Sequence, residues 1–167
     1  MTENKLENMD FNRIKRAEEL LKEKYREDFV VYQYVGQGML DDFYTVNAYA
    51  FSHPEMPFNA YVTIDGCSVS DEYFSKILCE KMAQKMMENM VGISGDFYIH
   101  IQPMLMSSAE RDIQISVEEY LKNNPFNFYT IYVYSDLKEK LTDLYVKIRD
   151  SVSKIGKIDG NLMLYEM

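Results

Sequence analysis

The chain has 167 residues, of which 47% are hydrophobic and 27% are charged, and its net charge at pH 7 is −9. This composition is typical of one folded domain with a sizeable core and argues against a disordered chain. The negative charge argues against nucleic acid as a partner, because phosphate neutralisation needs clustered Lys and Arg. It also disfavours binding to an anionic membrane surface.

No stretch approaches the roughly 18 consecutive apolar residues that a spanning helix needs, so the sequence predicts no membrane insertion. Residues 1–9 are polar and acidic and are expected to form a mobile leader, followed by a single α+β domain over residues 10–167. The expected location is the cytoplasm, with the cell envelope as the alternative if an anchor was removed. The two cysteines, Cys67 and Cys79, fit reduced thiols better than a secreted disulfide scaffold.

Three short strands are predicted in the first half of the chain. They follow a helix that begins at Asp10, a good N-cap residue, and ends near Lys24. Apolar and polar residues alternate over 29–35, 43–51 and 58–64, which is typical of strands with one buried face. The connections between the three strands are short, so we expect an antiparallel meander.

Helices and strands alternate in the second half. Ser70 is the predicted N-cap of a long helix over 71–90, and Ser116 with Glu119 forms the capping-box pattern of a short helix. A last helix is expected to open at Asp136. The predicted strands of this half are 97–102, 126–134 and 161–166.

The resulting order of elements is α-β-β-β-α-β-α-β-α-β. Purely parallel sheets favour strands that are continuous apolar runs, whereas these strands alternate. The sequence therefore predicts an α+β fold, with a mostly antiparallel or mixed sheet of five to six strands and the helices packed on one face.

The alternation over 97–102 assigns each of these side chains to one face of the sheet. Ile99 and Ile101 are expected to point toward the helices, which leaves Tyr98 and His100 on the outward face.

The same rule places Tyr61 and Tyr165 on the outward face. It is weaker for 126–134, where both faces are aromatic or β-branched, and this strand is expected to be central and covered on both sides. The inward residues of the strands that carry Tyr61 and Tyr165 are Phe58, Ala60, Val62, Ile64, Leu162 and Leu164.

No pattern indicates a catalytic or metal site, and no cofactor is expected. Gly36-Gln37-Gly38 lacks the third glycine and the following helix of a dinucleotide-binding loop. The two histidines, His53 and His100, come without the spaced ligands that zinc requires. The balance is therefore against an enzyme.

Four segments of the chain look familiar: 24–32, 58–62 with 64–66, 70–73 and 116–125. They resemble a family of small uncharacterised α+β proteins of Gram-positive bacteria, some of which are tethered to the cell envelope. The resemblance covers nearly the whole chain and implies no activity, cofactor or catalytic residue.

The leading hypothesis is a non-enzymatic binding or assembly module that contacts a protein partner, or a second copy, through a tyrosine-rich sheet face. Tyrosine gives a large contact area at low entropy cost and is enriched at interfaces. The alternative is a small-molecule or peptide-binding domain, a hydrolase included, with a pocket between the sheet and the loop 103–114. The predicted binding residues are Tyr61, Tyr98, His100 and Tyr165.

Overall fold

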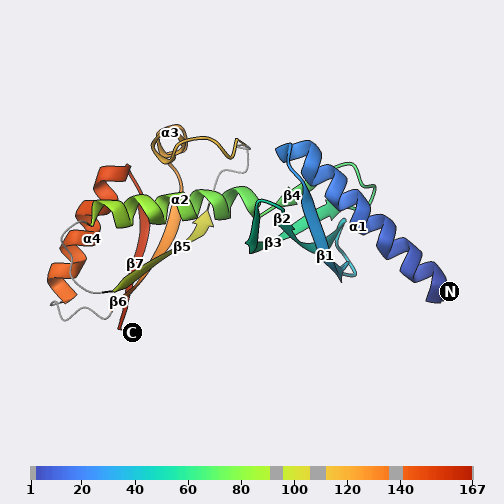
Figure 1. Cartoon of the computed structure of the whole chain (residues 1–167), viewed down its shortest axis with the longest axis horizontal. Helices are drawn as coiled ribbons and strands as arrows, with labels where there is room; N and C mark the ends of the chain where they lie inside the picture. The colour runs from blue at the N-terminus through green and yellow to red at the C-terminus, as the bar shows by residue number, and fades with distance from the viewer. Residues whose placement is uncertain (1–2, 91–95, 106–111, 136–140, 167) are drawn as a thin grey trace. The chain divides into compact units, whose positions relative to one another are not determined.

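The described part of the chain forms two compact units, Met1–Lys76 and Ile77–Met167, with four helices and seven strands (Figure 1). The strands make two sheets, one of four strands and one of three. The predicted α+β class is confirmed, whereas the prediction of one sheet of five to six strands is wrong. A single domain over residues 10–167 stays a prediction. The computed structural model describes residues 3–90, 96–105, 112–135 and 141–166.

The first unit is a helix followed by an antiparallel sheet of four strands in the order β1-β2-β3-β4. The predicted meander of three strands is confirmed. The fourth strand is not predicted by the sequence, which instead indicates Ser70 as the N-cap of a helix that begins at Asp71; the structure places both residues in β4 and begins the helix at Tyr73. The elements are α1 (Glu3–Tyr25), β1 (Phe29–Gly36), β2 (Phe43–Ala50), β3 (His53–Thr63) and β4 (Val69–Asp71).

Helix α1 begins at Glu3, well before the predicted start at Asp10. It buries one stripe of side chains that includes Ala17, Leu21 and Tyr25. Positions four residues apart lie on one face of a helix, so this spacing turns one side of α1 toward the sheet.

An aromatic cluster fills one end of the first core. Tyr73 has its ring centroid 5.1 Å from Tyr25, 5.2 Å from Phe29 and 5.2 Å from Phe58. Edge-to-face and tilted contacts at these distances are favourable for aromatic rings. The Tyr73 hydroxyl donates to Glu27 Oε1 at 2.8 Å, so its polar end has a partner.

The carboxylate of Asp71 is fully buried at the end of β4. It accepts hydrogen bonds from Lys24 Nζ at 2.6 Å, from the Tyr25 hydroxyl at 2.8 Å and from the Tyr73 amide at 3.0 Å. A buried charge is tolerated only when it is paired in this way. Asp71 therefore ties the end of α1 and the start of the next helix to the sheet.

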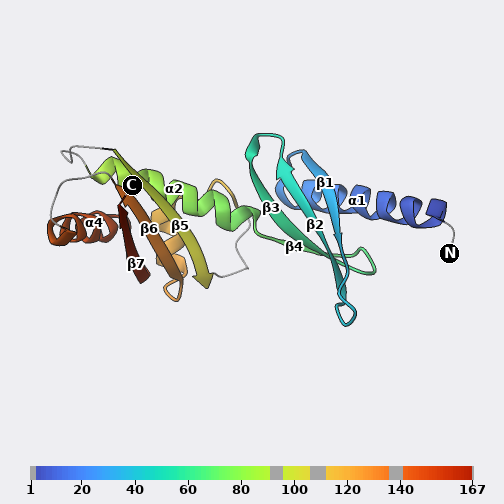
Figure 2. The ribbon, with the colours of Figure 1, turned by 90° about the horizontal axis from the view of Figure 1, so that it is seen from below.

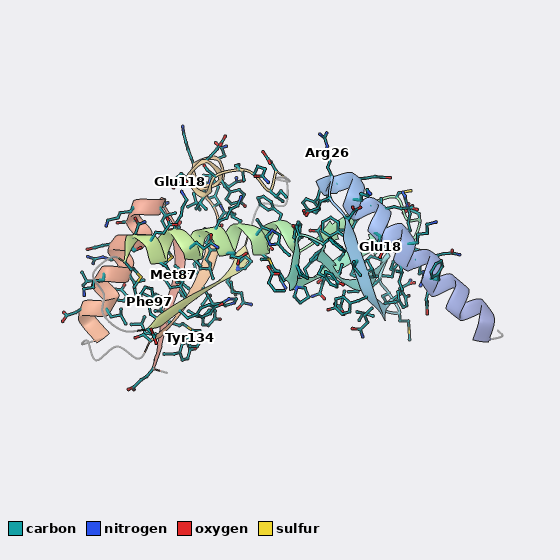
Figure 3. The ribbon with its side chains drawn as sticks, in the orientation of Figure 1. Glu18, Arg26, Met87, Phe97, Glu118 and Tyr134 are labelled. Carbon is teal, nitrogen blue, oxygen red and sulfur yellow. The ribbon has the colours of Figure 1, made fainter. Side chains whose placement is uncertain are left out.

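Strand β1 is at the edge of the first sheet and is bulged between Val31 and Gln33. The amide of Val31 donates to Glu18 Oε1 of α1 at 3.0 Å. Figure 3 labels Glu18 between the helix and this strand. A side chain of the helix thus takes the place of a neighbouring strand for this amide.

Ile64 was expected to point inward, and this prediction is wrong. Strand β3 ends at Thr63, so Ile64 lies in the turn that follows and is 48% exposed. The other inward residues of this strand, Phe58, Ala60 and Val62, are buried as predicted.

The second unit is a mixed sheet in the order β5-β6-β7, in which β5 pairs antiparallel and β7 parallel with β6. Strand β6 is central, as predicted. Helix α2 begins before the boundary between the units and continues past it. The elements are α2 (Tyr73–Asn89), β5 (Phe97–Leu105), α3 (Val117–Asn123), β6 (Phe128–Ser135), α4 (Leu141–Ile155) and β7 (Asp159–Glu166).

The second core lies between one face of this sheet and its helices. Met82 and Met86 of α2 and Ile148 of α4 are fully buried. The Ser151 hydroxyl of α4 donates to the Met86 carbonyl at 2.8 Å and joins the two helices. In Figure 2, α2 lies behind the three strands, so the viewer looks at the face that it leaves uncovered.

Two local features shape this unit. The Ser116 side chain accepts from the Glu119 amide at 3.2 Å, which confirms the predicted N-cap of α3. Gly160 of β7 pairs with Tyr129 of β6, and a Cβ on Gly160 would lie 1.9 Å from the Tyr129 carbonyl oxygen. Only glycine allows the backbones to approach this closely.

Candidate binding surface

The outward face of the second sheet is rich in tyrosine, and we call it the tyrosine face. Its side chains alternate with the buried residues Ile99 and Ile101 of β5 and Ile131 and Val133 of β6. Figure 3 shows the labelled Tyr134 on the side of the strands away from α2. The tyrosine face consists of Tyr98, His100, Gln102, Thr130, Tyr132, Tyr134, Asn161, Met163 and Tyr165.

Strand register brings these residues into rows across the sheet. Tyr98 pairs with Tyr134, which pairs with Tyr165, so one row consists of three tyrosines. In the next row His100 pairs with Tyr132. Side chains directly opposite in neighbouring strands are close enough to touch.

The rings of these rows contact one another. Tyr134 and Tyr165 are stacked, with centroids 5.1 Å apart and an angle of 17° between their planes. Tyr98 lies 6.3 Å from Tyr134, and Tyr132 lies 6.3 Å from Tyr165. His100 lies 5.9 Å from Tyr132. The result is one continuous aromatic surface across the three strands.

The hydroxyl groups of this surface are only partly bonded. The Tyr132 hydroxyl donates to Gln102 Oε1 at 3.2 Å, and the Tyr165 hydroxyl makes a weak contact to the Met163 sulfur at 3.6 Å. Those of Tyr98 and Tyr134 make no hydrogen bond to any residue that the structure describes. Tyr98 is 56% exposed and Tyr165 43% exposed. These polar ends are therefore available to an incoming group.

The charge of the tyrosine face is low. No Lys, Arg, Asp or Glu is among its residues, although 27% of the chain is charged. The charged residues of β7 lie at its two ends: Asp159 is two residues from Asn161 on the same side of the sheet, and Glu166 directly follows Tyr165. The Asp159 carboxylate is 3.6 Å from Lys157 Nζ. Depletion of charge together with tyrosine enrichment is the composition of an interface core.

The structure places the four predicted binding residues on two different sheets. Tyr98, His100 and Tyr165 come together on the tyrosine face. Tyr61 is on β3 of the first sheet, where it pairs with Thr45 and Ser70.

Tyr61 is part of a polar network on the outward face of the first sheet. Its hydroxyl donates to Glu72 Oε1 at 3.3 Å, and the Asn59 side chain donates to the same carboxylate at 3.2 Å. Asn59 in turn accepts from Asn47 Nδ2 at 2.6 Å. Burial, and next the charge of Glu72, raise the pKa of Tyr61. This tyrosine is engaged within the protein.

Sequence reasoning missed Tyr132 and Tyr134, which contribute the centre of the aromatic surface. Both faces of this strand are aromatic or β-branched, so no outward residues were chosen from it. Their positions in the sequence indicate the outward direction, because the two tyrosines alternate with the buried Ile131 and Val133. The strand was also expected to be covered on both sides, whereas Tyr132 and Tyr134 are only half-buried.

The described residues hold no group of three or more His, Cys, Asp or Glu that is placed to hold a metal ion. Cys79 is buried in α2, and burial raises the pKa of its thiol to about 12. Cys67 is exposed, and its hydrogen bond to Asp65 raises the pKa of its thiol. A thiol whose pKa is raised is a poor nucleophile at neutral pH.

The alternative hypothesis placed a pocket beside the loop 103–114. Residues 106–111 of this loop lie outside the described residues. The alternative therefore stays a prediction.

No helix in the described ranges is long and apolar enough to cross a membrane. Neither a family model nor a curated protein sequence matches the chain. A solved structure with a similar fold is a crystal structure of a DUF5037 family protein from Ruminococcus gnavus ATCC 29149. The two are 19% identical with a TM-score of 0.59, and the match covers 92% of this chain and 74% of that one. This likeness shows the fold, and it is consistent with the expected resemblance to an uncharacterised family.

Proposed function

We propose that this chain is a non-enzymatic binding module and that the tyrosine face is its contact surface. The observation that carries the proposal is the state of Tyr98 and Tyr134. Their rings contact other tyrosine rings, and their hydroxyls have no hydrogen-bond partner among the described residues.

The composition and the packing of this face support the same function. Tyrosine is enriched among residues that dominate binding energy, and it presents both a ring and a hydroxyl at a low cost in side-chain entropy. Rings that already stack on one another have lost much of their freedom before a partner arrives, so less entropy remains to be lost on binding. The strand pairing of the mixed sheet behind them fixes the rows in which the rings lie.

The double substitution of Tyr98→Ser and Tyr165→Ser tests the proposal. Both side chains are on edge strands and are substantially exposed, so the chain should still fold, with a loss of about 1–3 kcal/mol from the aromatic contacts across the strands. Loss of both rings should abolish self-association in analytical ultracentrifugation, or the capture of a partner by the tagged chain.

A matched control is Tyr32→Ser on β1. Tyr32 is 53% exposed and also contacts one other tyrosine, Tyr49, at 5.9 Å, but it belongs to the first sheet. This variant should bind as the unaltered chain does. If association and capture both persist in the Tyr98 and Tyr165 double variant, the proposal is wrong.

A further inference from the structure

We propose that the tyrosine face binds an extended, arginine-bearing segment of a partner protein, with guanidinium groups lying against the tyrosine rings. This inference rests on the proposed function and names the chemistry of the partner. It is argued from an arginine that the chain itself holds on two tyrosines, from the spacing of the rings and from charge.

The first unit contains an arginine held by two tyrosines. The guanidinium carbon of Arg13 lies 5.6 Å from the centroid of the Tyr34 ring and 5.0 Å from that of Tyr44. Arg13 also donates a hydrogen bond to the Tyr34 hydroxyl. The two ring centroids are 5.9 Å apart. A pair of tyrosines on a sheet of this protein therefore binds one guanidinium by its ring faces and by a hydroxyl.

The tyrosine face repeats this spacing without a cation. Its neighbouring tyrosine pairs have centroids 5.1 Å to 6.3 Å apart, a range that includes the distance between Tyr34 and Tyr44. In the described part of the chain, the cations placed over aromatic rings are Arg13 and Lys24, both on α1. The hydroxyls of Tyr98 and Tyr134 could accept from a guanidinium as that of Tyr34 does.

Net charge favours a basic partner over a second copy. The chain carries −9, so two copies repel each other and a basic segment is attracted. The face has no Lys or Arg of its own that would repel an arginine. His100 is the one member of the face, tyrosines apart, with a titratable side chain.

The row of three tyrosines suits an extended segment. Alternate side chains of an extended chain are roughly 6.6 Å apart on one side. Tyr98, Tyr134 and Tyr165 stand 6.3 Å and 5.1 Å apart along their row. A strand that crosses the sheet along this row would bring every second residue close to one of the rings.

The test uses a fluorescein-labelled peptide of alternating arginine and serine and measures anisotropy against the whole chain. The matched peptide replaces each arginine with citrulline, which keeps the shape and loses the charge, and a third peptide carries glutamate. We expect the arginine peptide to bind about tenfold more tightly than the citrulline peptide, because only the charged guanidinium makes cation–π contacts; tenfold corresponds to about 1.4 kcal/mol. The glutamate peptide should not bind.

Variants separate ring recognition from the attraction of a basic peptide to any acidic chain. Tyr134→Ser and Tyr165→Ser should each weaken binding of the arginine peptide about tenfold. Tyr134→Phe keeps the ring and should keep most of the affinity. Tyr145→Ser on α4 should change nothing, because Tyr145 is 47% exposed and has no aromatic ring contact among the described residues. Circular dichroism shows whether each variant is folded. If Tyr134→Ser does not fold, the test is made with Tyr165→Ser alone, because Tyr165 is on an edge strand.

Equal binding of the arginine and citrulline peptides would overturn the inference. So would arginine binding that persists in folded Tyr134→Ser and Tyr165→Ser variants, because the attraction would then be a property of net charge alone. Either result leaves the proposed function standing if the Tyr98 and Tyr165 double variant still loses association or capture. The proposed function is wrong only if the double variant keeps both self-association and partner capture.

Discussion

Tyr61 of the first sheet and the tyrosines of the second sheet differ in what surrounds them. In the first sheet Tyr61 is bonded to Glu72, which also holds Asn59, so the polar groups of that face bind one another. In the second sheet the rings of Tyr98 and Tyr134 contact rings, and their hydroxyls have no partner among the described residues. Strand alternation decides which face a tyrosine occupies, but its neighbours decide whether it is available to bind.

The cores of the two units show a related difference. The first depends on polar contacts at its rim, where Asp71 joins Lys24 and Tyr25 and where Tyr73 bonds Glu27. In the second, the hydroxyl of Tyr129 is buried without a hydrogen-bond partner in the described part of the chain. Burial raises the pKa of this phenol, with smaller contributions from Tyr120 and Cys79. Substitutions in each unit can test this contrast.

The largest effect is expected for Asp71→Ala in the first unit. It removes a buried carboxylate and leaves Lys24, whose side chain is only 14% exposed, without its partner. Loss of one partner of a buried pair costs about 3–5 kcal/mol. Urea denaturation measures the change. The control Asp28→Ala breaks the exposed contact to Lys22 and should cost less than about 1 kcal/mol. Equal losses would show that the buried charge has no special role.

A somewhat smaller effect is expected for Gly160→Ala in the second unit. The new methyl group would lie 1.9 Å from the Tyr129 carbonyl oxygen, so β7 must move away from β6. Overpacking of this kind costs about 3 kcal/mol, which the same denaturation experiment would detect. The neighbouring exposed position provides the control, Asn161→Ala, which should be nearly neutral. A stable Gly160→Ala variant would show that the two strands can separate at little cost.

The sharpest comparison uses one substitution in both units. Tyr73→Phe removes a hydroxyl that donates to the charged Glu27 and should cost about 2 kcal/mol. Tyr129→Phe removes a buried hydroxyl that has no partner in the described residues and should stabilise the protein by about 1 kcal/mol. Thermal denaturation of both variants shows whether each substitution lowers or raises the melting temperature. Destabilisation of equal size in both would mean that Tyr129 has a hydrogen bond after all.

Alternation predicted local faces well. The buried Ile99 and Ile101 and the outward Tyr98 and His100 lie as expected, because a period of two fixes direction along any single strand. It does not say which strands pair. The sequence therefore could not show that β1 to β4 and β5 to β7 form separate sheets, or that β7 runs parallel to β6.

Contacts between residues distant in sequence account for the other differences. The sequence predicts Asp71 as the first residue of a helix, since nothing local reveals its bonds to Lys24 and Tyr25. Tyr61 was chosen as a binding residue for a similar reason, because Glu72 is close to it only in the folded chain. Three of the four chosen side chains nonetheless lie on one surface, where strand register gathers them.

The carboxylate of Glu18 on the bulged edge of the first sheet has a consequence for solubility. An edge strand with free amides invites another chain to add to it, and this is how aggregation of sheet proteins often begins. Glu18 occupies the Val31 amide, and the bulge beside it disturbs the regular spacing that a foreign strand would need. One acidic side chain of a helix thus disfavours the pairing of another chain with the edge strand β1.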